Sequence, residues 1–155
     1  MGNLIGAKTD STSTTPLFGL GDSYEDQNGS VWVYVKASGA ISQYDVVTYD
    51  ETFNTTVASV TTSNAARDDK LGVAAVAFAS SEYGWLQIYG PCTINVAAAC
   101  VPNAELTMTS VAGVLDDATT ASLKVADGIA QTAASVSAAS TKAAILNFPK
   151  VGRTL

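Results

Sequence analysis

Alternating apolar and polar positions begin at residue 30 and predict β-strands. The segment 31–36 reads Val-Trp-Val-Tyr-Val-Lys and follows the turn signal Asn28-Gly29. Its β-branched and aromatic residues are typical of strands. Because successive strand side chains point to opposite faces, we expect the valines in a core and the aromatic residues on the second face. Similar patterns predict strands at 45–49, 57–61, 85–89 and 93–97.

The second half of the chain predicts more strands than helices. The run 71–79 is nearly all apolar, and its length, its valines and Gly72 favour a buried strand. Residues 117–146 are rich in alanine, a strong helix former. Interspersed Ser and Thr, Gly128 and the lack of a Glu/Lys face favour short strands there, with a helix in part of 133–144 as the alternative. Shorter strands are predicted at 106–108, 113–115, 130–132 and 143–148.

Many short strands separated by turn signals predict an all-β fold, a compact β-barrel or β-sandwich of short antiparallel strands. Two stretches of the chain, 37–47 and 98–107, also resemble each other. In both, an apolar residue is followed four positions later by an acid and then by an apolar strand. This similarity favours a barrel built from two similar units.

Residues 1–29 show no sustained period and predict an extended N-terminal arm, ahead of a single β domain over 30–155. The arm carries a short apolar patch at Leu17, Phe18 and Leu20. A disordered terminus is one interpretation, since chain ends are often loose. An arm that orders against a partner is the other, and the patch favours it because linkers rarely place Phe and Leu so close together.

Composition and charge exclude several classes of function. The 155 residues include 14 Asp and Glu, 8 Lys and Arg and no His, for a formal charge of −6. The lack of histidine excludes His-based triads, His–metal sites and imidazole acid–base catalysis. An acidic chain without a Lys/Arg cluster has no electrostatic footprint for nucleic acid. No run reaches the roughly 18 apolar residues of a membrane span, and the first residues lack the pattern of a secretion signal, so we expect synthesis in the cytosol.

The chain offers few candidates for chemistry. Acids cluster at Asp68-Asp69 and Asp116-Asp117, but adjacent strand residues face opposite sides, so we interpret both pairs as solvated turn carboxylates. Neither a nucleophile elbow nor a phosphate-binding glycine loop is present in the sequence. We therefore expect a protein that is not an enzyme and that has no catalytic residue, cofactor or metal site.

Two cysteines, Cys92 and Cys100, flank an apolar stretch that is typical of a packed strand. Free cysteine is among the most buried residue types. We interpret both as small buried hydrophobic residues, with a disulfide between them as the alternative. A metal pair is disfavoured because no further ligands accompany them.

Five aromatic residues lie in two of the predicted strand segments: Trp32, Tyr34, Tyr83, Trp85 and Tyr89. Aromatic residues on strands are common both in cores and at interfaces. Packing, in a second layer of a barrel or at a subunit interface, is the favoured interpretation. The alternative is an exposed platform on which sugar rings stack, as in a carbohydrate-binding module.

Four short motifs carry a resemblance to a known family: KASGAISQYDVVT at 36–48, KLGVAAVA at 70–77, YGWLQIYG at 83–90 and AGVLDD at 112–117. Over roughly residues 30–117 the chain resembles small capsid decoration (cement) proteins of tailed bacteriophages. Their recurring pattern is an Ala/Gly-rich turn before an acid and a strand, a Gly-Val-Ala strand, and a Gly-Trp-hydrophobic-Gln strand.

The resemblance implies a non-enzymatic β domain on the outer surface of the virion capsid. Related proteins commonly form homotrimers at threefold and quasi-threefold positions and bridge neighbouring copies of the major capsid protein. Under this hypothesis the arm at Leu17, Phe18 and Leu20 contacts the capsid and the β domain supplies the trimer contacts. A head fibre, a tail component and a carbohydrate-binding module remain the alternatives.

Overall fold

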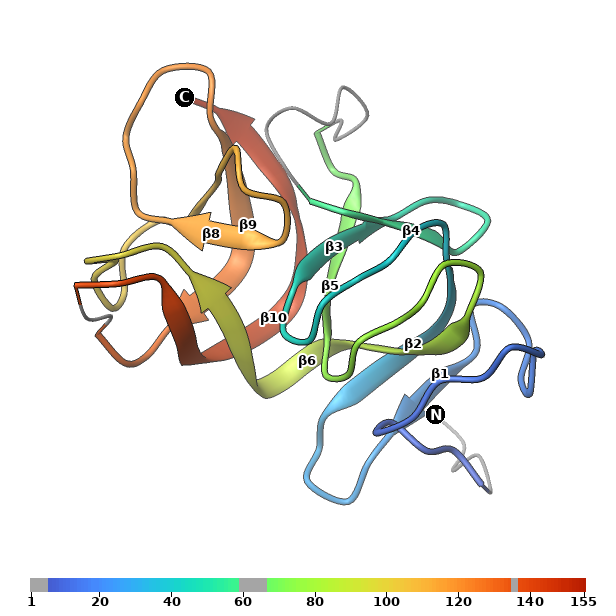
Figure 1. Cartoon of the computed structure of the whole chain (residues 1–155). Helices are drawn as coiled ribbons and strands as arrows, with labels where there is room; N and C mark the ends of the chain where they lie inside the picture. The colour runs from blue at the N-terminus through green and yellow to red at the C-terminus, as the bar shows by residue number, and fades with distance from the viewer. Residues whose placement is uncertain (1–5, 59–66, 135–136) are drawn as a thin grey trace.

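The computed structural model describes residues 6–58, 67–134 and 137–155. Every regular element of this part of the chain is a β-strand (Figure 1). The strands are β1 (Ser23–Glu25), β2 (Val31–Ala37), β3 (Val46–Tyr49), β4 (Asn54–Val57), β5 (Lys70–Ala74), β6 (Tyr83–Val96), β7 (Thr107–Met108), β8 (Val114–Asp116), β9 (Lys124–Gln131) and β10 (Ser140–Thr154). The all-β prediction is therefore confirmed. Among the described residues, none forms a helix long and apolar enough to cross a membrane.

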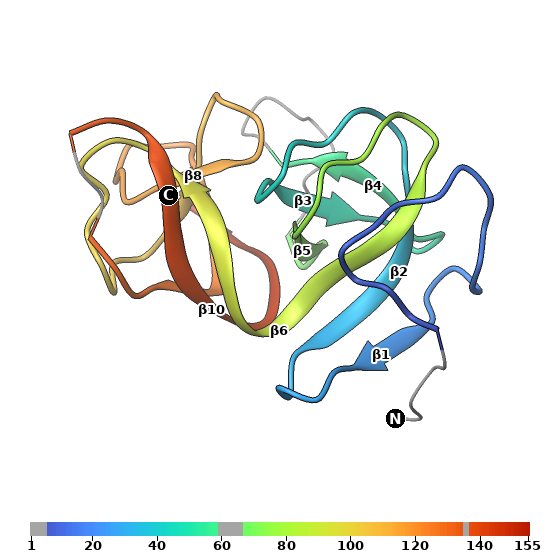
Figure 2. The same cartoon turned by 60° about the horizontal axis from the view of Figure 1, so that its bottom comes forward.

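The strands close into two five-stranded rings that share the long strand β6. In the first ring β2, β4, β3, β5 and β6 pair in that order, and β6 closes the ring by pairing with β2. In the second ring β6, β8, β7, β9 and β10 pair in that order, and β10 closes on β6. Figure 1 and Figure 2 show the rings side by side, with β6 running along both.

The two rings repeat one topology. In each, the first strand leads into an antiparallel hairpin, β3–β4 or β7–β8, whose second strand pairs parallel with that first strand. The similar stretches 37–47 and 98–107 occupy the same place in each ring, the connection into the hairpin. The two similar units that the sequence predicts are therefore present in the topology.

Each ring encloses apolar side chains, and the period-two pattern of β2 decides which ones. Val33 and Val35 lie in the core of the first ring, whereas Trp32 and Tyr34 lie on its outer face. The core of the second ring is larger and continues into Val46, Leu71 and Val73 of the first. Each fully buried side chain of this size contributes about 1.5–3 kcal/mol, so the shared core holds the rings together.

The prediction of two separate strands at 85–89 and 93–97 is wrong, because both lie in β6, with Gly90 and Pro91 inside the strand. Gly90 supplies a φ of +95°, which bends β6 as it passes from one ring to the other. β2 stops pairing at Tyr89 and β8 starts at Asn95, so Pro91 sits where β10 is the paired neighbour. Gln87 donates from Nε2 to the carbonyl oxygens on either side of Gly90, at 3.2 and 2.7 Å.

Other predicted boundaries shift. The strand predicted at 57–61 is β4 at Asn54–Val57, and residues 59–61 lie outside the described residues. The apolar run 71–79 is a strand only to Ala74, after which the chain turns and inserts Phe78 into the first-ring core with 2% exposure. The alternative helix in 133–144 is wrong over 140–144, which belong to β10, and 135–136 lie outside the described residues.

Candidate functional site

Residues 6–22, here called the N-terminal segment, pack along the outer face of the first ring (Figure 2). Ser13 and Tyr83 exchange backbone hydrogen bonds, with N···O distances of 2.9 and 2.8 Å. Beside this bridge, Thr12 Oγ1 donates to Glu82 Oε2 at 2.8 Å. These contacts attach the segment to the first residues of β6. Strand β1, which pairs with β2, also lies within the range assigned to the arm from the sequence.

An aromatic cluster beneath the N-terminal segment holds its second half. The Phe18 ring lies 5.4 Å from Tyr34 and 5.2 Å from Trp85, measured between centroids. The Tyr34 and Trp85 rings are 5.0 Å apart and their residues are 2% and 1% exposed. Leu17 N–H donates to Tyr34 Oη at 3.1 Å. Edge-on and tilted ring contacts of this kind add about 0.5–1.5 kcal/mol each beyond area burial.

This anchoring decides which residues of the apolar patch face outward. Phe18 points into the cluster, whereas Leu17 is 67% exposed and Leu20 is 41% exposed. The structure therefore presents two leucines from a backbone that is fixed on both sides of them. Their contact with a capsid stays a prediction, and Phe18 takes the role of an internal anchor.

The five aromatic residues singled out from the sequence differ in exposure. Three are buried: Trp32, Tyr34 and Trp85. Tyr83 is half-buried, with Lys36 Nζ 5.6 Å from its ring centroid. Tyr89 is 41% exposed and its ring lies 5.2 Å from that of Phe148. The two tryptophans therefore offer little ring surface for a sugar to stack on while the N-terminal segment is in place.

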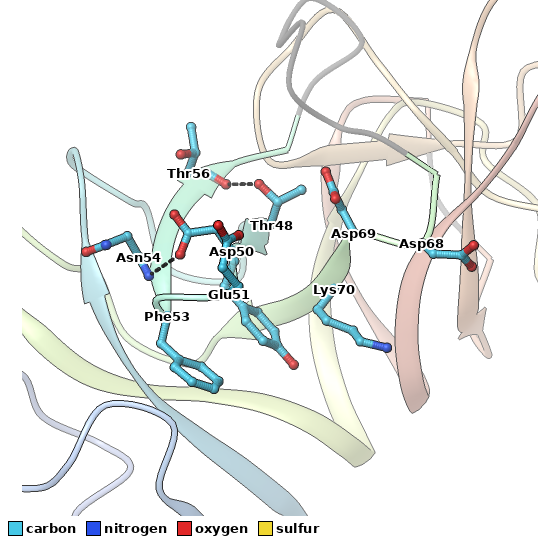
Figure 3. Close-up of a pocket in the computed structure, with 10 residues that line it drawn as sticks. Thr48, Asp50, Glu51, Phe53, Asn54, Thr56, Asp68, Asp69 and Lys70 are labelled. Carbon is cyan, nitrogen blue, oxygen red and sulfur yellow. Dashed lines mark hydrogen bonds between the residues drawn. The ribbon is translucent and has the colours of Figure 1, made fainter.

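A cavity of about 630 Å³ opens between the β3–β4 hairpin and the start of β5 (Figure 3). Four carboxylates line it, from Asp50, Glu51, Asp68 and Asp69, together with one basic side chain, Lys70. This excess of negative charge favours cationic groups in the cavity.

Two of the carboxylates of this cavity, those of Asp50 and Asp68, are engaged in hydrogen bonds or an ion pair. A hydrogen bond from Lys150 Nζ at 2.6 Å, together with its charge, holds the pKa of Asp68 below its ordinary value. Slight burial raises the pKa of Asp50, but hydrogen bonds from Thr52 and from the backbone of Asn54 and Thr52 outweigh it and lower the pKa overall. The cavity is thus an acidic groove in which the lowered pKa of Asp50 and of Asp68 favours their ionised forms.

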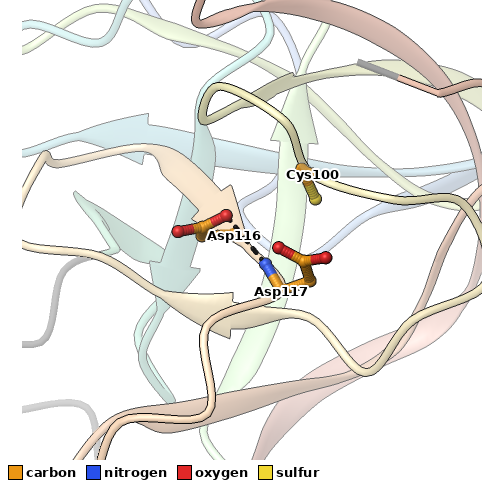
Figure 4. A group of neighbouring side chains, drawn as sticks. All are labelled: Cys100, Asp116 and Asp117. Atoms are coloured by element: carbon orange, nitrogen blue, oxygen red, sulfur yellow. Dashed lines mark hydrogen bonds between the residues drawn. The ribbon is translucent and has the colours of Figure 1, made fainter. Parts of the chain in front are cut away.

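A second cluster, in the second ring, brings together three side chains that are separated in the sequence: Cys100, Asp116 and Asp117 (Figure 4). Their potential ligand atoms lie within 4.8 Å of one another. The expectation that Asp116 and Asp117 are solvated is wrong, since both are half-buried. The alternation argument failed because β8 ends at Asp116, so the next side chain is free to turn toward the same side.

Cys100 and Asp117 of this cluster both form hydrogen bonds with other residues of the second ring. The Cys100 Sγ donates to Gln131 Oε1 at 3.0 Å, and Asp117 Oδ2 accepts from the Val101 N–H at 3.1 Å. Burial raises the pKa of Cys100 to about 11, and the charges of Asp117 and Asp116 add to that effect. Burial also raises the pKa of Asp116, with Asp117 contributing. A protonated thiol is a poor nucleophile. The hydrogen bonds of Cys100 and Asp117 tie the β6–β7 connection to the ends of β9 and β8.

Both cysteines are expected to be unreactive in the folded protein. They are free thiols, and burial raises the pKa of Cys92 to about 12. We expect iodoacetamide at pH 8 to modify either residue at least about a hundredfold more slowly than an unperturbed thiol, because the thiolate fraction falls with rising pKa. Mass spectrometry measures this, with the protein unfolded in guanidinium as the control. Rapid modification of Cys100 in the folded protein would contradict the assignment.

Comparisons with known proteins assign no family: no protein-family model matches the chain, and no curated protein matches it. Three of the four resemblance motifs lie in the first ring, at the β2–β3 connection, in β5 and in the first half of β6. The fourth covers β8 of the second ring.

Proposed function

We propose that the protein is a non-enzymatic virion structural protein that binds the outer surface of a phage capsid. In this role it stabilises the shell as a homotrimer that bridges neighbouring copies of the major capsid protein. The resemblance of residues 30–117 to capsid decoration proteins supports the proposal. So does the compact all-β fold, with its two rings sharing one core.

The observation that carries the proposal is the pair of exposed leucines on the anchored N-terminal segment. Leu17 and Leu20 lie on either side of Phe18, whose ring is held by Tyr34 and Trp85. A rigid backbone lowers the entropy lost when side chains on it are buried in a partner. Exposed apolar side chains presented in this way are typical of a binding surface rather than of a linker.

Modest contacts of this kind suffice for a cement. Burying two leucines on the shell supplies a few kcal/mol for each subunit. A trimer that engages neighbouring capsid subunits adds these contacts through effective concentration. Because such a protein binds the assembled shell and not its separated parts, mass action stabilises the shell. This mechanism needs no chemistry beyond burial and geometry.

The test is co-sedimentation of purified protein with undecorated, expanded capsids, followed by heating. We expect saturable binding and a higher temperature of capsid disruption. The double variant Leu17→Lys/Leu20→Lys should bind at least about tenfold more weakly, because burial of two charged side chains replaces burial of two apolar ones. Val111→Lys is the matched control, since Val111 is 60% exposed in a turn of the second ring and lies outside the segment.

Each outcome decides something different. Absence of binding by the unaltered protein at micromolar concentration would remove the capsid role. Unchanged binding by the double variant would keep the capsid role but remove the leucines from it. Binding confined to the tail or to head fibres of whole virions would replace the proposal with one of those roles.

A further inference from the structure

A second exposed apolar surface lies on the second ring, where β6, β9 and β10 run side by side. Its members are Tyr89, Pro91, Ala130, Ala143, Ile145 and Phe148, here called the junction face. Ile145 forms its centre, because it pairs with Pro91 of β6 on one side and with Ala130 of β9 on the other. Ile145 is 51% exposed and Phe148 is 55% exposed.

None of the six members of the junction face is charged, and Lys70 borders it beside Phe148. In β10 the outward residues Ala143 and Ile145 alternate with the buried residues Ala144 and Leu146. Lys142 has the same parity as the buried residues and therefore lies on the inward side of the strand. The outward positions across 89–95, 130–132 and 141–148 are otherwise apolar, hydroxyl or amide residues. The outward residues of an exposed sheet are normally polar, and charged residues are common among them. A face of three strands without a charged member is therefore unusual for a chain of this acidity.

The charge of the molecule lies elsewhere. Ten of the 14 acidic residues and four of the eight basic residues precede Tyr83, and four of each follow. The formal charge of −6 therefore belongs entirely to the N-terminal segment and the first ring up to the start of β6. The second ring, which carries the junction face, is electrically balanced.

Phe148, on this face, has a strained backbone conformation. Its φ is +47°, a left-handed conformation that is a genuine outlier for a bulky residue. It lies in the irregular part of β10, where the register with β9 shifts between Leu146 and Lys150. Such strain costs about 1–3 kcal/mol and persists only where the surrounding structure holds the residue in place. Here it holds an aromatic ring in solvent beside Tyr89.

We propose that the junction face is where a second copy of this chain packs. Copies that each carry −6 repel one another if their first rings meet, whereas contact through the balanced second ring keeps the acidic parts apart. The face also offers an aromatic pair and a central aliphatic residue, the usual anchors of an interface core. Packing about a symmetry axis brings the same residues of each copy together.

This inference rests on the homotrimer part of the proposed function and gives it a location. It does not depend on capsid binding, because association is measured on the isolated protein. A protein that self-associates through the junction face but ignores capsids keeps the inference and loses the proposed function. A protein that binds capsids but does not self-associate keeps capsid binding and loses both the inference and the homotrimer part of the proposed function.

The experiment is sedimentation velocity and equilibrium from about 1 to 100 μM, which covers contacts of micromolar Kd. We expect the unaltered protein to form a discrete oligomer, and Ile145→Lys to raise the association Kd at least about tenfold by placing a charge at the centre of the face. Val111→Lys adds the same charge to an exposed apolar position outside the face and should associate like the unaltered protein.

Two further readouts separate association from folding. Phe148→Gly removes the ring but favours a positive φ, so it should weaken association without lowering thermal stability. Raising the salt concentration to about 0.5 M should strengthen association, because it screens repulsion between acidic copies. A monomer at 100 μM, an Ile145→Lys variant of unchanged mass, or an association that salt weakens would each overturn the inference.

Discussion

Gly113→Ala should lower the free energy of unfolding by about 3 kcal/mol or more, and the melting temperature by roughly 10 °C. Gly113 has a φ of +79°, and a Cβ there would lie 2.4 Å from the carboxylate of Asp45. Asp45 is 7% exposed and accepts hydrogen bonds from Asn95 Nδ2 at 3.0 Å and from Ser42 N–H at 2.8 Å. Urea unfolding measures the loss.

Gly113 has this effect because it lies at the contact between the rings. Its N–H donates to Ala58 O at 2.8 Å and its carbonyl accepts from Val46 N–H at 3.0 Å. Gly29→Ala is the matched control, since Gly29 has a φ of +78° but no atom within 4 Å of its Cβ. That variant should lose only about 1 kcal/mol, from the backbone conformation. Equal losses at both glycines would contradict the ring contact.

Trp85→Ala should cost about 3–5 kcal/mol, the range for deleting a buried aromatic side chain. Trp85 is 1% exposed, and its ring contacts those of Phe18, Tyr24 and Tyr34. Its loss removes both packing and the support of the N-terminal segment. We therefore also expect trypsin to cleave after Lys8 more readily, because loosened termini are preferred proteolytic sites.

Tyr89→Ala tests the same strand at an exposed position. Tyr89 lies in β6 four residues after Trp85 but is 41% exposed. Measured at protein concentrations too low for association, it should cost less than about 1 kcal/mol. A Tyr89→Ala loss as large as that of Trp85→Ala would mean that the buried cluster has no special role in stability.

Local patterns predict the faces of this fold but not its closure. The alternation in β2 records which side chains meet a core, so the inward valines and outward aromatics follow from it. The pairing of β2 with β6 and of β6 with β10 joins segments far apart in the chain, and no short pattern encodes it. The similarity of 37–47 and 98–107 is the one sequence signal of the double ring.

Residues that usually mark turns gave wrong predictions at two places, because the surrounding strands decide the structure there. Gly90 and Pro91 normally end strands, yet here they mark the point where β6 exchanges β2 for β10. Asp116-Asp117 has the composition of a solvated turn, but the curvature at the end of β8 brings both acids to Cys100. Such placements depend on the ring as a whole.

The candidate surfaces were predictable in part. The proximity of Leu17, Phe18 and Leu20 indicates a contact segment, but only the fold shows that Phe18 is the anchor and the leucines face out. The junction face was not found from the sequence, because Ile145 and Phe148 look like ordinary strand residues. The lack of charge at alternate positions over 141–148 is the signal that could have revealed it.

The most direct measurement is a cryo-EM difference map between capsids with and without bound protein. We expect added density on the outer surface, in groups of three around threefold and quasi-threefold positions. Each unit should hold the two-ring fold, with Leu17 and Leu20 against the shell and Ile145 toward the local axis. Added density only at the tail, or a shell indistinguishable from the undecorated one at saturating protein, would contradict the capsid role.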